Sequence, residues 1–426
     1  MRNYKNIKIS VLWILLLTLL MLITHCSVRK HTNVFDPKSG IDTLDMKLEL
    51  RSADSIVTLS WIPHYDTEIK GFHLYRRAGN QTQFSSLAIL PAGQTEYRDS
   101  LVQFDTPYAY YLTLIGASGE SPPTPVLKTV PGPGQIWVLD RWNEYILKFS
   151  YDMRHRLLSH YAIWIPQALA FNKQKNLAII TYPLYHYAEV IDPTSGLLKQ
   201  EITDIRYPYA CAFNPKSRAF YISDSLGALY QFTPNGSVQL LDGELGKPEE
   251  IVFDAQGNAA VLDSYKKALI LYQADGTRRA EITGFNGHRF RSLRFLSVNQ
   301  AGSYFYFIER NDTSDVLFRL STLTDSISPV FEGQGLRAVR ESPMDHSLWL
   351  AVNSDNGANI LQLSPSGLRL NTLNGFKFIT DIAVNPINGN LIIADRDAHQ
   401  VIHMRSDGSR IGVFEEAPYP FKVYIE

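Results

Sequence analysis

A motif that recurs about every forty residues constrains the fold of this chain more than any other feature. The segments "PQALAF", "PYACAF", "PEEIVF" and "PFKVYI" each begin with a Pro and continue with alternating apolar positions, and "FRSLRF", "LRAVRE" and "ITDIAV" are weaker copies. The segments start at residues 166, 208, 248, 290, 336, 379 and 420, so their spacing is 40 to 46 residues. Three further short strand-like segments follow each start except the last. A period near forty with four strands per unit predicts the blades of a β-propeller.

One unit is incomplete, and the C-terminus supplies what it lacks. Residues 135–162 contain a second, third and fourth strand but no Pro-led first strand, whereas the final "PFKVYI" is a first strand with nothing after it. A lone terminal strand cannot satisfy its own backbone groups. We therefore expect it to pair with the strand from Gln135 to Asp140 and to close the ring, which removes exposed sheet edges. The expected fold is an all-β propeller over residues 131–426 with seven blades, and six is the alternative count.

The second strands of the units end in a polar residue, and the third strands run into turns such as "TPNG", "QADG" and "SPSG". In this pattern the units resemble the NHL repeat, in which a strand ending in Asp precedes a strand ending in Asp-Gly or Asn-Gly. The polar residues that end the second strands are Asp140, Asp224, Asp263, Glu309, Asn353 and Asp395. Because they recur in nearly every unit, we interpret them as braces that accept hydrogen bonds from the following loop.

Residues 45–130 are expected to form a separate all-β module. Short segments such as "SIVTLSWIP", "GFHLYRRAG" and "YAYYLTLIGASGES" alternate with turns and predict a small β-sandwich. With Trp61 in the second strand, Tyr75 in the third and a Gly-Glu-Ser finish after the last segment, the module resembles a fibronectin type III domain. That resemblance implies a spacer or an adhesive surface and no catalytic residue.

The N-terminus has the layout of an export signal. Arg2, Lys5 and Lys8 precede the uncharged run "VLWILLLTLLMLIT", which ends at "LITHCS". This end resembles the bacterial lipoprotein box, which implies that Cys26 is lipidated, although His25 departs from the small residue usual there. An uncleaved anchor helix is the alternative. Residues 1–26 are thus the expected signal or anchor and 27–44 a polar tether, which would hold the folded part on a bacterial membrane, facing the periplasm or the cell exterior.

Charge and cysteine content narrow the classes of partner. The 41 Lys and Arg residues nearly balance the 42 Asp and Glu residues, so nucleic acid is not an expected partner. Cys26 and Cys211 are the only cysteines, and a disulfide between the signal region and a predicted strand is not expected. We expect Cys211 to be a small buried apolar residue and the protein to be a monomer.

Strand order assigns the loops of the predicted propeller to two opposite faces. The loops between second and third strands share one face with the connections between blades, and this face collects aromatic and basic residues of the kind enriched at recognition surfaces. We predict a recognition or scaffold protein that binds a protein, peptide or glycan of the cell envelope through this face, without catalysis and without a cofactor. The candidate binding residues are Arg141, Trp142, Trp164, Tyr185, His186, Tyr207, Tyr265, Lys266, Lys267, His288, Arg289, Arg310, Arg396 and His399.

A metal-dependent hydrolase or lyase with its site at the propeller axis is the alternative. Amidating lyases among the propellers that this chain resembles hold zinc through His residues of inner strands, but the expected inner strands here contain no His. Gluconolactonase-like propellers bind calcium at the centre. On the first strands only the carboxylates of Glu249, Glu250 and Asp381 are expected near the axis, without Asn partners, so we predict no metal site.

Overall fold

The computed structural model describes residues 35, 46–62, 69–117, 119–142, 145–162 and 165–426. The predicted signal, and the predicted tether apart from Phe35, lie outside these residues. The chain forms two compact units: one includes Leu59–Tyr97 and Tyr108–Lys128, and the other includes Leu50–Thr58, Arg98–Pro107 and Thr129–Glu426. In the described part of the chain, no helix has the length and apolar character needed to span a membrane.

The larger unit contains seven four-stranded antiparallel sheets among its described residues. The composite sheet is made of β38(Pro420–Ile425), β9(Ile136–Asp140), β10(Tyr145–Phe149) and β11(Arg156–Tyr161). The second sheet contains β12(Ala168–Asn172), β13(Leu177–Tyr182), β14(Tyr187–Ile191) and β15(Leu198–Ile202). The third contains β16(Pro208–Asn214), β17(Ala219–Asp224), β18(Ala228–Phe232) and β19(Val238–Asp242). The fourth contains β20(Pro248–Phe253), β21(Ala259–Asp263), β22(Ala268–Tyr272) and β23(Arg278–Ile282).

The last three sheets follow a small hairpin, β24(Gly284–Phe285) and β25(His288–Arg289). The fifth sheet contains β26(Leu293–Val298), β27(Tyr304–Arg310), β28(Asp315–Ser321) and β29(Ile327–Gly333). The sixth contains β30(Leu336–Glu341), β31(Leu348–Ser354), β32(Gly357–Leu363) and β33(Arg369–Phe376). The seventh contains β34(Ile379–Val384), β35(Leu391–Asp395), β36(Gln400–Met404) and β37(Arg410–Phe414). Two short 3-10 turns, η2(Lys173–Lys175) and η3(Pro183–Tyr185), lie in loops of the β12–β15 sheet.

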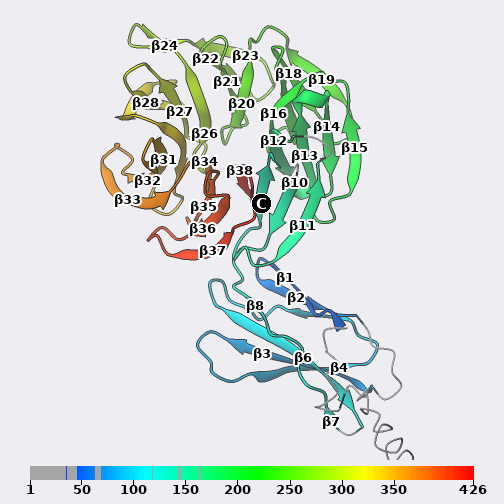
Figure 1. Cartoon of the computed structure of the whole chain (residues 1–426). Coiled ribbons are helices and arrows are strands. Elements are labelled where there is room, and N and C mark those ends of the chain that lie inside the picture. The colour runs from blue at the N-terminus through cyan, green and yellow to red at the C-terminus, as the bar shows by residue number, and fades with distance from the viewer. Residues whose placement is uncertain (1–34, 36–45, 63–68, 118, 143–144, 163–164) are drawn as a thin grey trace, which may run out of the picture. The chain divides into compact units, whose positions relative to one another are not determined.

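The sheets are arranged as in a β-propeller, with the first strands toward the middle and the fourth strands at the rim (Figure 1). The second strands β9, β13, β17, β21 and β35 are buried along nearly their whole length, because neighbouring sheets cover both of their faces. The fourth strands β11, β15 and β23 are largely exposed. Because the second strands are more deeply buried than the fourth strands, they are near-continuous apolar runs in the sequence.

Buried apolar clusters join each sheet to the next around the whole ring. The cluster that contains Trp137 and Ile180 joins the composite sheet to the β12–β15 sheet. The cluster that contains Val423 and Ile392 joins the composite sheet to the β34–β37 sheet. Packing therefore runs through the composite sheet without a break.

The predicted pairing of the C-terminal strand is confirmed. Strand β38 runs antiparallel to β9, with Val423 opposite Val138 and Tyr424 opposite Trp137. The last residue adds two contacts, because the Glu426 carboxylate accepts a hydrogen bond from the Trp137 indole N–H at 2.8 Å and lies 2.7 Å from the Lys148 ammonium. The chain end is thus fastened by strand pairing, by packing and by an ion pair with a largely buried lysine.

The N-terminal strands also form antiparallel sheets. One is β4(Ser85–Pro91), β3(Gly71–Ala78), β6(Tyr108–Gly116) and β7(Gly119–Glu120), with β8(Leu127–Thr129) paired to β6, and the other is β1(Glu49–Ala53), β2(Ile56–Ser60) and β5(Glu96–Asp99). Trp61 is buried and packs edge-on against Phe72, with ring centres 5.4 Å apart. Alternate side chains of β6, including Tyr108, Tyr110 and Leu112, are buried, as the sequence pattern predicts.

Candidate functional site

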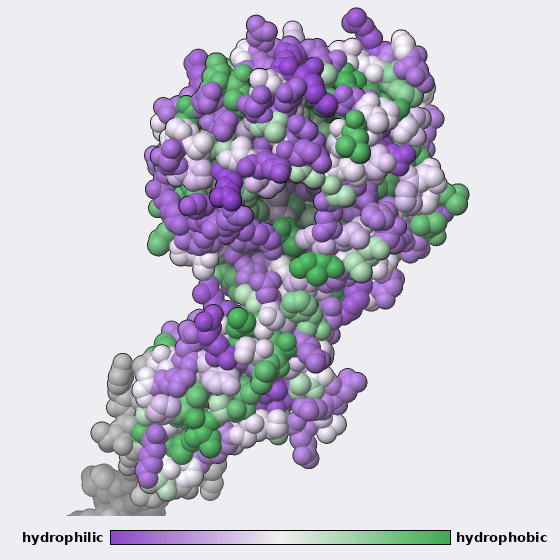
Figure 2. All heavy atoms as spheres, turned by 180° about the vertical axis from the view of Figure 1, so that it is seen from behind, coloured by the Kyte–Doolittle hydropathy of each residue, from purple (hydrophilic) through white to green (hydrophobic). Residues whose placement is uncertain are grey.

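The middle of the larger unit contains a polar cavity of about 450 Å³, which we call the axial cavity. All seven first strands, β12, β16, β20, β26, β30, β34 and β38, contribute to its lining. Figure 2 shows this unit hollowed near its middle, with hydrophilic side chains beside the hollow. The charged residues that line the axial cavity are Arg141, Glu249, Glu250, Arg294, Arg337, Arg340, Asp381 and Lys422.

Each carboxylate of the axial cavity has a cationic partner. The pairs, with their N···O distances, are Glu249 with Lys247 (2.6 Å), Glu250 with Lys422 (3.1 Å) and Asp381 with Arg340 (3.3 Å). The three carboxylates therefore reach the axis as predicted. Because each is already neutralised by a cation, a calcium ion would have to displace three ion pairs to use them as ligands.

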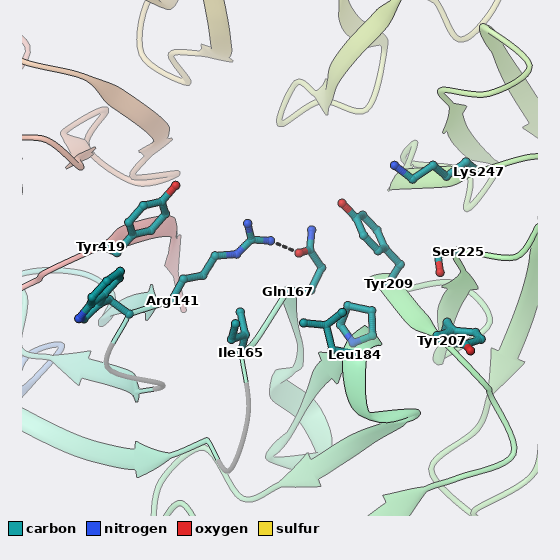
Figure 3. Close-up of a pocket in the computed structure, with 11 residues that line it drawn as sticks. Arg141, Ile165, Gln167, Leu184, Tyr207, Tyr209, Ser225, Lys247 and Tyr419 are labelled. Carbon is teal, nitrogen blue, oxygen red and sulfur yellow. Dashed lines mark hydrogen bonds between the residues drawn. The ribbon is translucent and has the colours of Figure 1, made fainter.

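A second cavity of about 470 Å³ lies beside the first, and we call it the aromatic cavity (Figure 3). Aromatic rings dominate its lining, with two cations and few other polar groups. Its lining residues are Arg141, Trp142, Ile165, Gln167, Pro183, Leu184, Tyr207, Tyr209, Ser225, Lys247 and Tyr419. They come from loops between second and third strands, from connections between sheets and from the starts of first strands, which is the set of loops assigned to the predicted binding face.

Arg141 stands where the two cavities meet. Its guanidinium donates a hydrogen bond to the side-chain oxygen of Gln167, and its centre lies 3.3 Å from the centre of the Phe421 ring. Burial lowers the pKa of the Arg141 guanidinium. Arg141, Gln167 and Tyr209 line both cavities, so a ligand in the aromatic cavity would lie against residues that also face the axis.

Of the fourteen predicted binding residues, three line the aromatic cavity: Arg141, Trp142 and Tyr207. Trp164 lies outside the described residues. Ten others are not among the residues that line this cavity: Tyr185, His186, Tyr265, Lys266, Lys267, His288, Arg289, Arg310, Arg396 and His399. The structure thus brings together the predicted residues of the composite sheet and of the connection before β16. Two of the others contact residues that line the cavity: the His186 ring centre lies 4.3 Å from that of Tyr207, and Arg396 lies over the Tyr419 ring at 5.5 Å.

The predicted histidines make local hydrogen bonds. His186 and His399 each use Nδ1 to donate to a backbone carbonyl, that of Arg206 and that of Pro418, both at 2.7 Å. His288 lies 3.2 Å from the Glu309 carboxylate. Across the residues that the structure describes, no group of three or more His, Cys, Asp or Glu side chains is placed to hold a metal ion.

Several predicted cations are engaged with neighbours near the sheet edges. Arg396 lies 2.6 Å from the Asp397 carboxylate and stacks over the Phe378 ring at 3.9 Å, and Arg310 is 3.6 Å from Asp315. Tyr265, in contrast, is 78% exposed. A protein surface rich in such residues is common, so their presence alone does not mark a site.

Sequence reasoning missed most of the aromatic cavity. Tyr209 lies inside β16, so it escaped a search restricted to loop residues, whereas Tyr419 lies in the connection before β38 and was overlooked in the segments that the search covered. Both directly flank a Pro of the repeated motif, Pro208 and Pro420, and this position next to the motif is the one signal that would have found them. Leu184 and Ser225 carry no such signal.

Three of the polar residues that end the second strands, Asp140, Asp224 and Asp263, accept hydrogen bonds from the following loop as predicted, whereas Glu309 and Asp395 brace the preceding connection and Asn353 bonds Ile379 of the next sheet. The Asp224 carboxylate accepts hydrogen bonds from the backbone N–H of Leu226 at 2.8 Å, in the following loop, and of Tyr207 at 3.2 Å, in the preceding connection. The Asp395 carboxylate likewise accepts from the N–H of Phe378 at 2.9 Å. These residues therefore shape the loops of the binding face and also the connections beside them.

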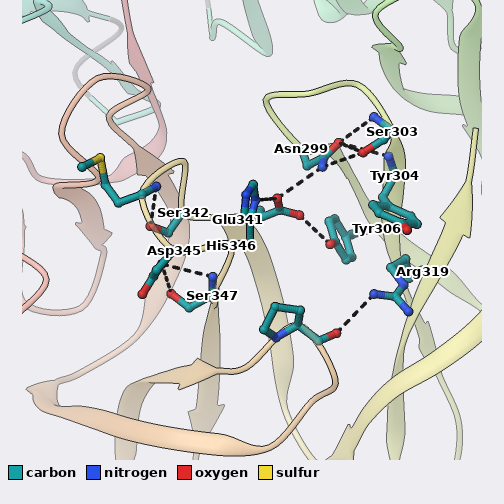
Figure 4. Close-up of polar contacts among 12 residues, drawn as sticks. Asn299, Ser303, Tyr304, Tyr306, Arg319, Glu341, Ser342, Asp345, His346 and Ser347 are labelled. Atoms are coloured by element: carbon teal, nitrogen blue, oxygen red, sulfur yellow. Dashed lines mark hydrogen bonds and ion pairs between the residues drawn. The ribbon is translucent and has the colours of Figure 1, made fainter.

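A separate polar cluster surrounds Glu341, at a turn between first and second strands (Figure 4). Its carboxylate accepts from the Tyr306 hydroxyl at 2.6 Å and from the Asn299 amide at 3.2 Å, and it lies 2.9 Å from His346 Nδ1. Burial, followed by the hydrogen bond to Glu341, raises the pKa of Tyr306. The cluster links the β26–β29 sheet to the β30–β33 sheet by hydrogen bonds, so its role is structural.

On the N-terminal module, Ser86, His73 and Glu120 form a hydrogen-bonded chain. The Ser86 hydroxyl is 2.6 Å from His73 Nε2, and His73 Nδ1 is 2.8 Å from the Glu120 carboxylate. The order is that of a catalytic triad, but acyl transfer also requires backbone or side-chain donors aimed at an oxyanion. Ser86 pairs with Tyr75 at a register shift in the β3–β4 ladder, and the Glu120 carboxylate also accepts hydrogen bonds from the hydroxyls of Tyr75 and Thr113.

Cys211 lies on β16 and faces the axial cavity. Its thiol donates weakly to the backbone carbonyl of Ile179, at 3.7 Å, and burial raises the pKa of the thiol to about 12. It therefore stays protonated at neutral pH and is not a nucleophile.

Comparison with known proteins identifies the fold and no family. No protein-family model matches the sequence, and no curated protein matches it. A functionally unknown protein from Desulfotomaculum acetoxidans DSM 771 is similar in structure, with a TM-score of 0.55 and 11% identity over 68% of this chain and 98% of the other. A 6-phosphogluconolactonase-like protein from Bacteroides uniformis ATCC 8492 matches with a TM-score of 0.54 and 14% identity over 69% of this chain and 99% of the other.

Proposed function

We propose that this protein is a recognition protein of the bacterial cell envelope that binds a protein, peptide or glycan through the face carrying the aromatic cavity, without catalysis. The observation that carries the proposal is the composition of that cavity, in which Trp142, Tyr207, Tyr209 and Tyr419 surround about 470 Å³. Rigid aromatic side chains with a polar edge supply large contact area at little cost in conformational entropy. A concave, mostly apolar site with a few polar groups is typical of ligand binding.

The architecture proposed with this function is a fibronectin type III spacer over residues 45–130 followed by a seven-bladed NHL-like propeller over residues 131–426. The seven four-stranded sheets and the continuous ring of apolar clusters support that blade count. The antiparallel sheet of β4, β3, β6 and β7, together with the buried Trp61 that packs on Phe72 of β3, supports the spacer.

Attachment to a membrane through Cys26 belongs to the same proposal and rests on the sequence alone. Mass spectrometry of the protein purified from the membrane fraction tests it: a diacylglycerol-modified N-terminal Cys26 is the expected product. A Cys26→Ser variant that stays in the membrane and carries an intact N-terminus would replace lipidation by the anchor-helix alternative.

The binding proposal is tested with the full chain and fractionated envelope proteins, peptidoglycan and polysaccharide. We expect Trp142→Ala and Tyr207→Ala to weaken binding at least tenfold, because each removes an aromatic wall of the cavity. Leu323→Ala is the matched control, since Leu323 is 80% exposed in a turn between third and fourth strands, on the opposite face. Equal binding by all three variants would overturn the proposal.

Hydrolysis of a sugar lactone is the second candidate function. The likeness to a 6-phosphogluconolactonase-like protein and the carboxylates of Glu249 and Glu250 in the axial cavity favour it. Turnover of δ-gluconolactone or 6-phosphogluconolactone that is lost on Glu249→Gln or Glu250→Gln, together with stoichiometric metal by elemental analysis, would establish the enzyme. A metal-free protein without turnover leaves recognition as the function.

A further inference from the structure

The axial cavity carries an excess of positive charge. Five cationic residues line it against three carboxylates, and two of the cations, Arg340 and Lys422, pair with Asp381 and Glu250. The third carboxylate, Glu249, pairs with Lys247, which is not among the residues that line the axial cavity. Three arginines of the lining thus remain: among the described residues, no carboxylate lies within ion-pair distance of Arg141, Arg294 or Arg337.

Two of these arginines are poorly solvated. The buried Nε of Arg141 has no hydrogen-bond partner within the described chain, and Nε of Arg337 reaches only the Thr380 carbonyl, at 3.3 Å. Burial lowers the pKa of Arg337; nearby Asp381 opposes this shift, and Arg310 and Arg294 add to it. A desolvated guanidinium without a carboxylate in direct contact is unfavourable, and a bound anion would reduce that cost.

Guanidinium groups select the chemistry of such an anion. Their planar set of N–H donors matches the paired oxygens of a carboxylate or a phosphate. The neighbouring aromatic cavity offers a different environment, with rings and with the hydrogen-bonding groups of Gln167, Ser225 and three tyrosines. Sugar rings use both kinds of contact, apolar C–H faces against aromatic rings and hydroxyls against polar groups.

We propose that the two cavities together bind an acidic saccharide, with its carboxylate or phosphate group held in the axial cavity by Arg141, Arg294 and Arg337 and its sugar ring in the aromatic cavity. This assignment of the ligand class rests on the proposed recognition function of the face. Because Arg141, Gln167 and Tyr209 line both cavities, one small ligand can touch both sets of groups.

The test is calorimetric titration of the full chain with glucuronate, glucose and inorganic phosphate. Glucuronate should bind at least tenfold more tightly than glucose, and Arg337→Met and Arg294→Met should each raise its Kd at least tenfold. Arg369→Met is the matched control, because Arg369 is an exposed arginine of β33 without a carboxylate partner in the described chain, remote from both cavities. Because either arginine variant could misfold, the test uses both Arg337→Met and Arg294→Met.

The outcomes of this titration distinguish a failure of the proposed anion site from a failure of the proposed recognition function. Phosphate binding that depends on Arg337 and persists in Trp142→Ala supports the axial anion site, even if envelope binding fails. No binding of either anion, or binding unchanged in both the Arg337 and Arg294 variants, overturns it. Arginine-dependent binding of tetraglutamate in place of glucuronate would reject the saccharide and assign the site to acidic peptides.

Discussion

Asp263 illustrates how single residues shape the binding face. Its buried carboxylate accepts hydrogen bonds from the backbone N–H groups of Gly246 (2.6 Å), Lys247 (2.9 Å) and Lys266 (2.9 Å). Asp263→Ala would leave these donors without a partner, and we expect a loss of about 3 kcal/mol in the free energy of unfolding. Urea denaturation measures it. Asp355→Ala, at an exposed turn of the same kind, should change stability by less than about 0.5 kcal/mol, and equal losses would refute the brace.

His403 makes stability depend on pH. Its Nδ1 donates to the Tyr151 carbonyl at 2.5 Å, its Nε2 is buried without a partner in the described chain, and burial lowers its pKa from 6.5 to about 4. Between these values the unfolded chain binds the proton more readily than the folded chain does, so stability falls as the pH falls from 6.5 to 4. The expected contribution is about 3 kcal/mol.

Urea denaturation of the wild type and His403→Phe at pH 7.5 and 4.5 measures this contribution. The Phe variant should lose less stability than the wild type on acidification, because it cannot take up the proton. The same loss in both proteins would show that other groups cause the acid sensitivity.

At the residue level, sequence reasoning predicts repeated features better than single ones. The braces were predictable because Asp224 and Asp395 occupy the same place in different units. Tyr209 and Lys247 lie next to the Pro of the motif, but that position recurs in several units and does not show which units line the aromatic cavity. A repeat motif carries no information about that choice. The excess of arginines over carboxylates at the axis likewise becomes visible only when the first strands converge.

Among the elements, the connection before β30 is under a tight steric constraint. Gly335, just before β30, has φ +74°, and a Cβ there would lie 1.8 Å from the Asn353 carbonyl oxygen. Gly287, in the β24–β25 hairpin, has φ +79°, but its Cβ would meet nothing within 4 Å. Gly287→Ala should therefore cost only the left-handed backbone term of about 1 kcal/mol.

Gly335→Ala carries the same cost for the left-handed backbone, and its methyl group also clashes with the Asn353 carbonyl. We therefore expect a loss of at least about 3 kcal/mol in the free energy of unfolding. Thermal and urea denaturation of the two variants compare open and crowded positions at nearly the same φ. Similar losses would mean that the connection before β30 can shift to admit a methyl group.

Strand pattern predicted the elements of the repeats well. Three of the four Pro-led segments became β16, β20 and β38 with their first residues at the predicted positions, and the fourth, from Pro166, became β12, which starts two residues later at Ala168. The weaker copy at Phe290 starts three residues later, at Leu293, because the hairpin of β24 and β25 precedes it. That two-residue pairing has no alternation long enough to read from sequence, and neither does the first strand of the N-terminal module, β1.

For the whole molecule, closure by β38 is the feature on which the other sheets depend. Deleting residues 418–426 removes the partner of β9, the Lys148–Glu426 ion pair and the contribution of Val423 to the apolar cluster. We expect a loss of about 5 kcal/mol or more, with less cooperative unfolding, because both neighbouring sheets lose their packing. Glu426→Gln, which keeps the strand, should cost much less. A truncated protein that melts like the full chain would contradict closure.

Site-specific photo-crosslinking in intact cells tests recognition by the aromatic cavity most directly. Benzoylphenylalanine would replace Trp142, in the aromatic cavity, or Leu323, on the opposite face, in the full chain. We predict that irradiation gives a discrete adduct with an envelope component from position 142 and none from position 323. An adduct from position 323 alone, equal adducts from both, or none from either would contradict binding through the aromatic cavity.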